Sequence, residues 1–387
     1  STKLAIAKVL SLAYKVRYQE GNYNDLVSVP LVFFGQKMPS IYNVFAWFLI
    51  ILDNERQIYT KYPFDFVVVE LGTDGPNQIS QFRKYFHLDL AVMTAITPEH
   101  MEFFETLENV ATEEWSVSFF SDFILANKDL CQILPLNIDN KKIRFYGKEF
   151  GSFYKIVNLQ KNKNVFLFEI NFGGEKSIDF VYQGFSEVEV YSIVAAIVVG
   201  HRFGLDFEKI KEKIKKIKNF SGRMQRLEGL NSSIIIDDTY NASPVAVKLA
   251  LESLYKEEAP YRIAMLGNMN ELGVIAESEH KKIGEFCNPK FLDLVVTVGI
   301  EANQFLAPAA RLNGCRVYEA KNAIDAGKFV AKEIRKNSLI LAKGSQNGVF
   351  MEEALKLIIK NKSDFSKLVR QDNNWLKVKK RQGLTFD

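Results

Sequence analysis

The sequence predicts an α/β fold of two domains, each built on a mainly parallel β-sheet. Short apolar runs without polar alternation recur along the chain, and each is followed by a polar turn and a helical pattern. Continuous apolar strands separated by helices are typical of parallel sheets covered on both faces. At 387 residues the chain is also too long for one ordinary core. Its 47% of hydrophobic and 25% of charged residues are ordinary for a globular protein.

Six apolar runs are the expected parallel strands. They are residues 66–69, 90–94, 234–236, 263–266, 294–296 and 339–341. Between residues 141 and 183 the pattern becomes alternating, and residues 162–164 and 173–174 supply polar and glycine turns. This stretch is predicted to be an antiparallel meander added to the first sheet.

The helical segments place the domain boundary near residue 220. The basic, amphipathic residues 1–17 suit either a targeting peptide or a core-facing helix, and the strand-like continuation favours the helix. Helical patterns follow at 187–201 and 208–218, before turn residues at 219–222. We therefore predict domains 1–220 and 221–387. The charged tail after Lys362 is predicted to pack loosely.

Charge and cysteine content restrict the class of protein. The 50 Lys and Arg against 46 Asp and Glu leave a net charge of +4, too small to indicate nucleic acid. Cys131, Cys287 and Cys315 lack the spacing of a metal site or a disulfide framework, which favours a reducing compartment. No apolar run reaches the roughly 18 residues of a membrane span. We expect a cytoplasmic protein that binds neither membrane nor nucleic acid.

The strongest local pattern is residues 237–244, DDTYNASP. An apolar strand ends in two acids, and Ser243 and Pro244 then suit the N-cap and first turn of a helix. Its expected apolar face is Val247, Ala250, Leu251 and Leu254. Polar groups at the carboxyl end of a parallel strand, beside a helix N-terminus, suit a phosphate-bearing ligand and its metal. A capped helix with solvated acids is the alternative.

Further motifs occur in both predicted domains. In the second they are residues 222–225 (GRMQ), 266–273 (LGNMNELG) with His280 beyond, and 343–345 (KGS). In the first they are residues 21–24 (GNYN), 29–31 (VPL), 69–72 (VELG), 94–100 (TAITPEH) and 127–129 (NKD). With residues 237–244, these resemble in type and order the motifs of the Mur ligase family, most of all its D-alanyl-D-alanine-adding members.

The resemblance implies a fold and an activity. The fold would be the family's central ATPase-type domain, with the antiparallel meander, followed by a Rossmann-like C-terminal domain. The activity would be an ATP-dependent amide-bond ligation in bacterial peptidoglycan synthesis, joining D-Ala-D-Ala to a UDP-MurNAc-tripeptide through an acyl-phosphate. ATP and Mg²⁺ would be the cofactors, the substrates small molecules, and the protein a monomer.

Site residues are implied motif by motif. Glu70 and His100 would bind magnesium, with a core or capping role as the alternative for His100. Arg223, Asp238, Tyr240 and Asn241 would bind the nucleotide or its metal; Arg223 could instead be an ordinary linker residue. Asn22, Asn24, Lys343 and Ser345 would contact substrate. Because both follow apolar runs, we expect Glu70 and His100 at the carboxyl ends of adjacent strands.

Two departures from the family pattern concern the phosphate and magnesium sites. The sequence begins with residues that match the text just after the lysine of the family's phosphate-binding loop, Gly-x-x-Gly-Lys-Thr. We expect these 387 residues alone, lacking that loop and the family's N-terminal domain, to be inactive as a ligase. Glu114 occupies the position of a family lysine that is carbamylated to hold a second magnesium. We expect it to replace that carbamate; a solvated helix residue is the alternative.

Two rival functions stay open. Another ligase of the superfamily, such as a folylpolyglutamate or cyanophycin synthetase, would share the fold and the use of ATP. A non-catalytic Mur-like protein could bind a cell-wall precursor or a partner enzyme.

Overall fold

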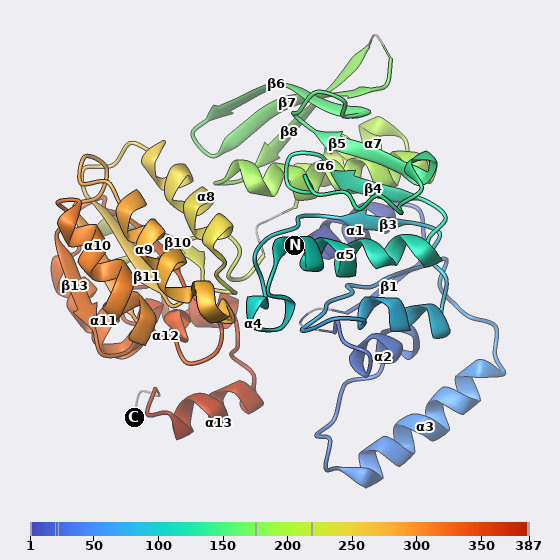
Figure 1. Ribbon diagram of the computed structural model, residues 1–387, viewed down its shortest axis with the longest axis horizontal. Helices are drawn as coiled ribbons and strands as arrows, with labels where there is room; N and C mark the ends of the chain where they lie inside the picture. Colours follow the sequence, from blue (N-terminus) through green and yellow to red (C-terminus); the bar gives the residue numbers. More distant parts are fainter. Residues whose placement is uncertain (1, 20, 22, 175, 218–219, 385–387) are drawn as a thin grey trace. The chain divides into compact units, whose positions relative to one another are not determined.

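The chain forms two compact units in the computed structural model (Figure 1). The structure describes residues 2–384 except 20, 22, 175 and 218–219. Unit 1 comprises Ser1–Ile96, Thr106–Gln183 and Glu189–Ile217; unit 2 comprises Thr97–Glu105, Gly184–Val188 and Lys218–Asp387. The units differ from the predicted domains, 1–220 and 221–387, because unit 2 takes two short segments from the first half of the chain.

The larger sheet of unit 1 has the order β3-β4-β5-β6-β7-β8. Its strands are β3 (Ala91–Met93), β4 (Ile124–Asn127), β5 (Ile143–Gly147), β6 (Tyr154–Asn162), β7 (Val165–Phe172) and β8 (Ser177–Gln183). Neighbouring strands from β3 to β6 pair in parallel. β7 pairs antiparallel with β6 and also with β8. The mixed sheet was predicted correctly, but its antiparallel part begins at β6 and not at residue 141. Apolar alternation marks a strand without indicating its direction, so the parallel pairing of β5 could not be foreseen.

A second, two-stranded sheet in unit 1 pairs β1 (Val16–Tyr18) with β2 (Phe66–Val68) in parallel. The helix before it, α1 (Thr2–Leu10), buries Ala5, Ala7 and Val9, so the N-terminal segment faces a core. The remaining helices and turns are α2 (Ser28–Phe34), α3 (Val44–Ile58), η1 (Ile79–Lys84), α5 (Leu107–Trp115), η2 (Ser116–Phe120), η3 (Asn140–Lys142), α6 (Glu187–Arg202) and α7 (Phe207–Ile214).

Helix α3 is apolar in sequence and exposed in structure. None of its residues is buried, and Val44, Phe45 and Ile51 are each more than half exposed. Even its less exposed positions, such as Trp47 and Asn54, are only partly buried. None of the helices described is both long enough and apolar enough to cross a membrane.

Unit 2 has a six-stranded sheet of order β13-β12-β11-β14-β10-β9. The strands are β9 (Gln225–Glu228), β10 (Ile234–Asp238), β11 (Arg262–Gly267), β12 (Leu294–Val298), β13 (Val317–Ala320) and β14 (Leu339–Lys343). All are parallel except β9, which pairs antiparallel with β10. The order reverses where β14 returns between β11 and β10, as in a Rossmann-like sheet. This confirms the predicted fold of the second part of the chain.

Two cores cover the two faces of this sheet. One contains Ile235, Met265 and Val296 of the strands with α11 (Ala323–Glu333) and α12 (Met351–Leu355). The other contains Ile236, Ala264 and Val295 with α8 (Pro244–Tyr255), α9 (Ala276–Phe286) and α10 (Ala307–Leu312). Successive strand residues point to opposite faces, so a run that is apolar throughout feeds both cores. The other short elements are α4 (Met101–Phe104), η4 (Leu230–Ser232), η5 (Gly273–Ile275), the π-helical η6 (Ala302–Leu306) and η7 (Lys362–Lys367).

Helix α8 begins as predicted, with one difference. Pro244 stands in its first turn, and Val247, Ala250, Leu251 and Leu254 are all buried. Ser243, however, makes no side-chain capping hydrogen bond.

The C-terminal tail is anchored, so the prediction that it packs loosely is wrong. Helix α13 (Asn373–Arg381) carries Lys379, whose side chain is completely buried. The ring of Trp375 lies edge-on to that of Phe350, with 6.0 Å between centroids. The tail's charges misled the prediction, because a charge can be buried when opposite charges meet it there.

Candidate functional site

The two acids at the end of β10 have different environments. Parallel pairing places Asp238 beside Lys343 of β14, and the two side chains form an ion pair of 2.6 Å in which both are almost fully buried. The Lys343 ammonium also donates to the carbonyl of Asn241 at 2.9 Å. The amide of Met224 donates to the Asp238 carboxylate at 3.2 Å. These bonds make the pair the central polar contact at this end of the sheet.

Asp237 points into the protein. It is completely buried; one carboxylate oxygen accepts from the amide and hydroxyl of Thr239, and the other has no hydrogen-bond partner in the structure. Burial is the main cause that raises the pKa of Asp237 to about 6; the nearby carboxylates of Glu352 and Asp238 add to it, and the hydrogen bonds from Thr239 partly offset it. The protonated form of Asp237 is therefore favoured well above the usual range of an aspartate.

Ser345 joins three of the motifs. Its hydroxyl donates to the carbonyl of Ala242 at 3.2 Å and accepts from the amide of Asn270 at 2.9 Å. Its own amide donates to the carbonyl of Asn268 at 3.0 Å. The strands before these loops approach closely, because a Cβ on Gly344 would lie 3.2 Å from the Cα of Gly267. The sequence-distant motifs therefore meet at one edge of the sheet.

Arg223 lies over the ring of Tyr240, with 3.9 Å between the guanidinium carbon and the ring centroid. Gly222 has a left-handed φ of 64°, and a Cβ there would lie 3.0 Å from the amide nitrogen of Tyr240. That amide donates to the carbonyl of Gly222 at 3.0 Å. The GRMQ and DDTYNASP motifs thus pack together, and the stacked guanidinium keeps the planar fork that suits phosphate.

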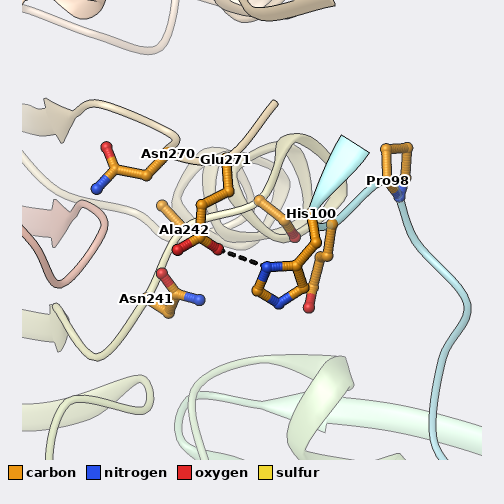
Figure 2. Close-up of a pocket in the computed structure, with 8 residues that line it drawn as sticks. Pro98, His100, Asn241, Ala242, Asn270 and Glu271 are labelled. Atoms are coloured by element: carbon orange, nitrogen blue, oxygen red, sulfur yellow. Dashed lines mark ion pairs between the residues drawn. The ribbon is translucent and has the colours of Figure 1, made fainter. Parts of the chain in front are cut away.

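His100 belongs to unit 2, where it pairs with Glu271 (Figure 2). The His100 Nδ1 lies 2.8 Å from the Glu271 carboxylate, which lowers the pKa of Glu271. Both residues have left-handed backbones, with φ of 53° and 66°. Asn241 and Asn270 line the same small pocket, and Figure 2 shows the imidazole and carboxylate turned toward each other beside Asn241. Backbone strain in both partners is typical of a functional site.

His280 has a structural role. It is fully buried; its Nε2 accepts from the amide of Met269 at 3.0 Å, and its Nδ1 donates to the carbonyl of Ala276 at 2.8 Å. Burial lowers the pKa of His280, which agrees with a neutral ring that uses both nitrogens. This histidine holds the LGNMNELG loop on α9.

In unit 1, the motif residues gather after β1 and β2. The Lys3 ammonium lies 3.1 Å from the Glu70 carboxylate and donates to the carbonyl of Gly21 at 3.0 Å. The amide of Gly72 donates to the carbonyl of Asn24 at 2.8 Å, and a Cβ on Gly72 would lie 2.4 Å from the Asn24 side-chain nitrogen. The GNYN and VELG motifs are therefore in contact. Asn22, the other predicted substrate residue, lies outside the described residues.

Glu113 and Glu114 are neighbours on α5 with different environments. Glu113 is buried, and its carboxylate accepts three backbone amides, those of residues 77–79, at 2.6–2.7 Å. It thereby holds the start of η1. Glu114 is half-buried, and its carboxylate is close enough to contribute, after burial, to raising the pKa of Cys131 to about 12. The Glu113 carboxylate therefore already has a structural role in binding backbone amides. The role of Glu114 in metal binding stays a prediction.

The expected adjacency of the strands carrying Glu70 and His100 is wrong. β2 pairs with β1, whereas β3 pairs with β4 of the other sheet. β2 and β3 are consecutive strands in the sequence, which suggested that they pair. Strand pairing, however, depends on contacts between strands in the folded sheet. Among the residues that the structure describes, no three His, Cys, Asp or Glu side chains form a group that could hold a metal ion.

Sequence reasoning missed two charged partners of the motifs. Glu271 was quoted within LGNMNELG without a role, although it is the partner of His100. Arg370 was assigned to a loose tail, although it donates to the carbonyls of Thr239 and Tyr240. The left-handed positions of these residues leave no signal in the sequence, since neither is glycine or asparagine.

Comparison with known proteins now identifies the family. The pattern of the Mur ligase middle domain matches residues 54–200, and that of the Mur ligase glutamate ligase domain matches residues 222–346. Glu70, His100, Arg223, Asp238 and Lys343 lie within these two segments. The chain belongs to the Mur ligase family.

Individual relatives agree. The UDP-N-acetylmuramoyl-tripeptide–D-alanyl-D-alanine ligase of Bacillus subtilis is 26% identical over 93% of this chain and 74% of its own length. The enzyme of that name from Escherichia coli is 23% identical over 93% of this chain and 75% of its own length. The crystal structure of the Thermotoga maritima MurF ligase with ADP superposes with a TM-score of 0.72 at 21% identity, covering 92% of this chain and 77% of that one. The chain thus spans about three quarters of these relatives.

Proposed function

We propose that this protein is an ATP-dependent amide-bond ligase that joins D-Ala-D-Ala to a UDP-MurNAc-tripeptide. It acts on small-molecule substrates in the cytoplasm, as a monomer. One observation supports this most: Asp238, Lys343, Ser345 and the Arg223–Tyr240 pair come from separate family motifs and are assembled at one sheet edge. Relatives that are similar over most of the chain are ligases of this name.

The reaction has two steps. A carboxylate oxygen of the tripeptide attacks the γ-phosphorus of ATP, the bond to the ADP oxygen breaks, and an acyl-phosphate forms. The amine nitrogen of D-Ala-D-Ala then attacks the acyl carbon, the bond to the phosphate oxygen breaks, and the nitrogen loses a proton. In phosphoryl transfer the protein mainly orients the reactants and stabilises charge.

The residues of unit 2 supply two of these needs. Arg223, held flat on Tyr240, offers parallel N–H donors to phosphate oxygens. Lys343 has its ammonium fixed by Asp238 and by the Asn241 carbonyl, so it shapes the loop that carries Asn241. The pocket between His100, Asn241 and Glu271 is lined by polar groups and suits a small polar group of the substrate.

Magnesium fits the donors of unit 1. Mg²⁺ usually takes one or two carboxylates, with water and phosphate oxygens completing its shell, so a dedicated cage is not required. The Glu70 side chain is 49% exposed, so its carboxylate is accessible to solvent. Glu70 would hold the ion, and Glu114 would add a second charge. When bound, Mg²⁺ neutralises negative charge that develops on the transferred phosphoryl group.

The test is a substrate-dependent assay of the protein expressed from its complete reading frame. We expect ADP release that requires both UDP-MurNAc-tripeptide and D-Ala-D-Ala, with one amide product per ADP. Arg223→Met, which removes the fork but keeps a long apolar stem, should lower the rate about 100-fold.

The same assay separates the rivals. ADP release with glutamate and a folate, but not with D-Ala-D-Ala, would assign the protein to the folylpolyglutamate ligases. Binding of the UDP-linked tripeptide with no product under any pairing would indicate a non-catalytic binding protein. Either result would overturn the proposed activity.

A further inference from the structure

Arg370, far along the chain from every motif, holds the turn that follows β10. Its guanidinium donates to the carbonyls of Thr239 and Tyr240, at 2.5 and 3.0 Å. The same group makes a two-point ion pair with Glu352, at 2.8 and 2.7 Å. Arg370 and Glu352 are almost fully buried there. One side chain therefore fixes two consecutive carbonyls of the DDTYNASP motif.

Arg370 is itself held by the last helix. Its backbone is left-handed, with φ of 54°, which costs free energy in a residue that is not glycine. The fully buried Lys379 ammonium donates to the Arg370 carbonyl at 2.8 Å and pairs with Glu352 and Glu353 at 2.8 and 2.7 Å. This network, Glu352, Glu353, Arg370 and Lys379, balances two buried acids with two buried cations. It keeps the guanidinium in one orientation.

The bonds of Arg370 to this turn also affect the residues that are proposed to bind the nucleotide. The peptide group between Thr239 and Tyr240 is held from both sides, because its N–H donates to the Gly222 carbonyl and its C=O accepts from Arg370. The Tyr240 ring in turn carries the guanidinium of Arg223 at 3.9 Å. Moving the carbonyls of this turn would therefore move both the ring and the stacked arginine.

We propose that Arg370 is a positioning residue for nucleotide binding, which acts by holding the Thr239–Tyr240 turn. This inference rests on the proposed function, because that function assigns Arg223, Tyr240 and Asn241 to ATP. The C-terminal tail is then part of the binding machinery. A planar guanidinium is needed because one group must reach a carboxylate and two carbonyls at once, which an ammonium cannot do with the same geometry.

Three variants separate positioning from general stabilisation. Arg370→Met removes the bonds that the guanidinium makes to Glu352 and to the carbonyls of Thr239 and Tyr240. Arg370→Lys keeps the charge next to Glu352 but not the fork. Lys356→Met is the matched control, because Lys356 pairs with Glu353 of the same network at 2.8 Å and, within the described part of the chain, makes no ion pair with the turn. All three are compared by thermal unfolding, by the affinity for ADP with Mg²⁺ from calorimetry, and by hydrogen exchange of the amides of residues 239–243.

The two arginine variants should weaken ADP binding about tenfold, or about 1.4 kcal/mol, and speed exchange in residues 239–243. Lys356→Met should lower the melting temperature but leave the affinity within about twofold. Arg370→Lys should unfold at a temperature closer to that of the wild type than Arg370→Met and still bind poorly.

Wild-type affinity and wild-type exchange in Arg370→Lys would overturn the proposal. An equal loss of affinity in Lys356→Met would also overturn it, since stability alone would then explain the effect. Failure of the wild type to bind ADP would count against the proposed function and not against positioning. In that event faster exchange at 239–243 in Arg370→Lys supports the positioning role, and unchanged exchange refutes it.

Discussion

Two strand ends of this protein look alike in sequence and differ in structure. β2 leads into Glu70 and β10 ends in Asp237 and Asp238, so in both an apolar parallel strand runs into acids. The Glu70 side chain is 49% exposed, and its carboxylate lies 3.1 Å from the Lys3 ammonium. The Asp238 side chain is 9% exposed and is paired with Lys343 at 2.6 Å. The Glu70 carboxylate is therefore much more exposed to solvent than the Asp238 carboxylate, which is enclosed by the protein.

The difference in exposure between the Glu70 and Asp238 carboxylates suggests different roles, ligand binding for Glu70 and stabilisation of the fold for Asp238. An exposed carboxylate can exchange its ammonium for a metal ion at little cost, because water shares the charge. A buried pair cannot, since parting the two ions leaves a charge without solvent. We therefore expect changes to the buried Asp238–Lys343 pair to act mainly on stability and changes to Glu70 mainly on ligand binding. The direct contacts to the nucleotide then fall to residues around Asp238, such as Arg223 and Asn241.

The largest expected effect is that of Lys343→Met. Removing this cation strands the buried Asp238 carboxylate and leaves the Asn241 carbonyl without its donor, so the free energy of unfolding should fall by about 3–5 kcal/mol. Urea denaturation measures it. The control is Lys360→Met, which breaks an exposed pair with Glu228 and should cost at most about 1 kcal/mol. An equal loss of unfolding free energy in the two variants would show that the buried Asp238–Lys343 pair stabilises the fold no more than an exposed pair does.

A pH series tests whether Asp237 is protonated in the folded protein. Its pKa of about 6 lies above the usual value near 3.9, so the folded state binds more protons between these two pH values. The free energy of unfolding should therefore fall as pH rises through this window and level off above pH 6. Asp237→Asn removes the effect: relative to the wild type, its stability should improve by about 3 kcal/mol from pH 4 to pH 7. A constant difference between the two proteins would show that Asp237 is ionised throughout.

Glu114→Gln tests the metal assignment in unit 1. If Glu114 replaces the carbamylated lysine, loss of its charge should lower Mg²⁺ affinity and turnover by about thirtyfold, or about 2 kcal/mol. Glu114→Lys should instead make turnover depend on bicarbonate. Glu113 is unsuitable as a control, because it accepts three backbone amides and its replacement would unfold the start of η1. Glu108→Gln, exposed on the same helix, is the matched control. Normal turnover in Glu114→Gln would end the metal assignment.

The smallest expected effect is that of Lys3→Met. Lys3 pairs with Glu70, whose side chain is half exposed to solvent. The free energy of unfolding should therefore change by only about 1 kcal/mol. Because the Lys3 ammonium competes with a cation for Glu70, Mg²⁺ binding measured by calorimetry should tighten about threefold. Glu70→Gln should abolish the same binding. A stability loss as large as that of Lys343→Met would show that the Glu70 carboxylate is enclosed by the protein as well.

The fold was predictable where the local pattern was strong. Runs such as residues 263–266 and 294–296 became β11 and β12, because a strand buried on both faces must be apolar throughout. The direction of β5 and the pairing of β2 with β1 were not predictable. They depend on which strands meet across the sheet, and a single segment carries no information about that.

Two helices show the same limit for burial. α3 reads as a core helix, VFAWFLIILDNERQI, yet none of its residues is buried. α13 reads as a surface helix, NNWLKVKKR, yet Lys379 is fully buried. Hydropathy describes what a side chain gains by leaving water, whereas burial also depends on whether a complementary surface or charge is present.

The sequence by itself determined the α/β class, the Rossmann-like second part, and the motif residues that gather at the sheet edges, because those depend on local periodicity and residue type. Only the tertiary structure decided which of those residues are open and which are occupied. Lys343 lies 105 residues from Asp238, and Arg370 lies 131 residues from Thr239. An ion pair or a held carbonyl forms only where folding brings such distant groups within about 3 Å.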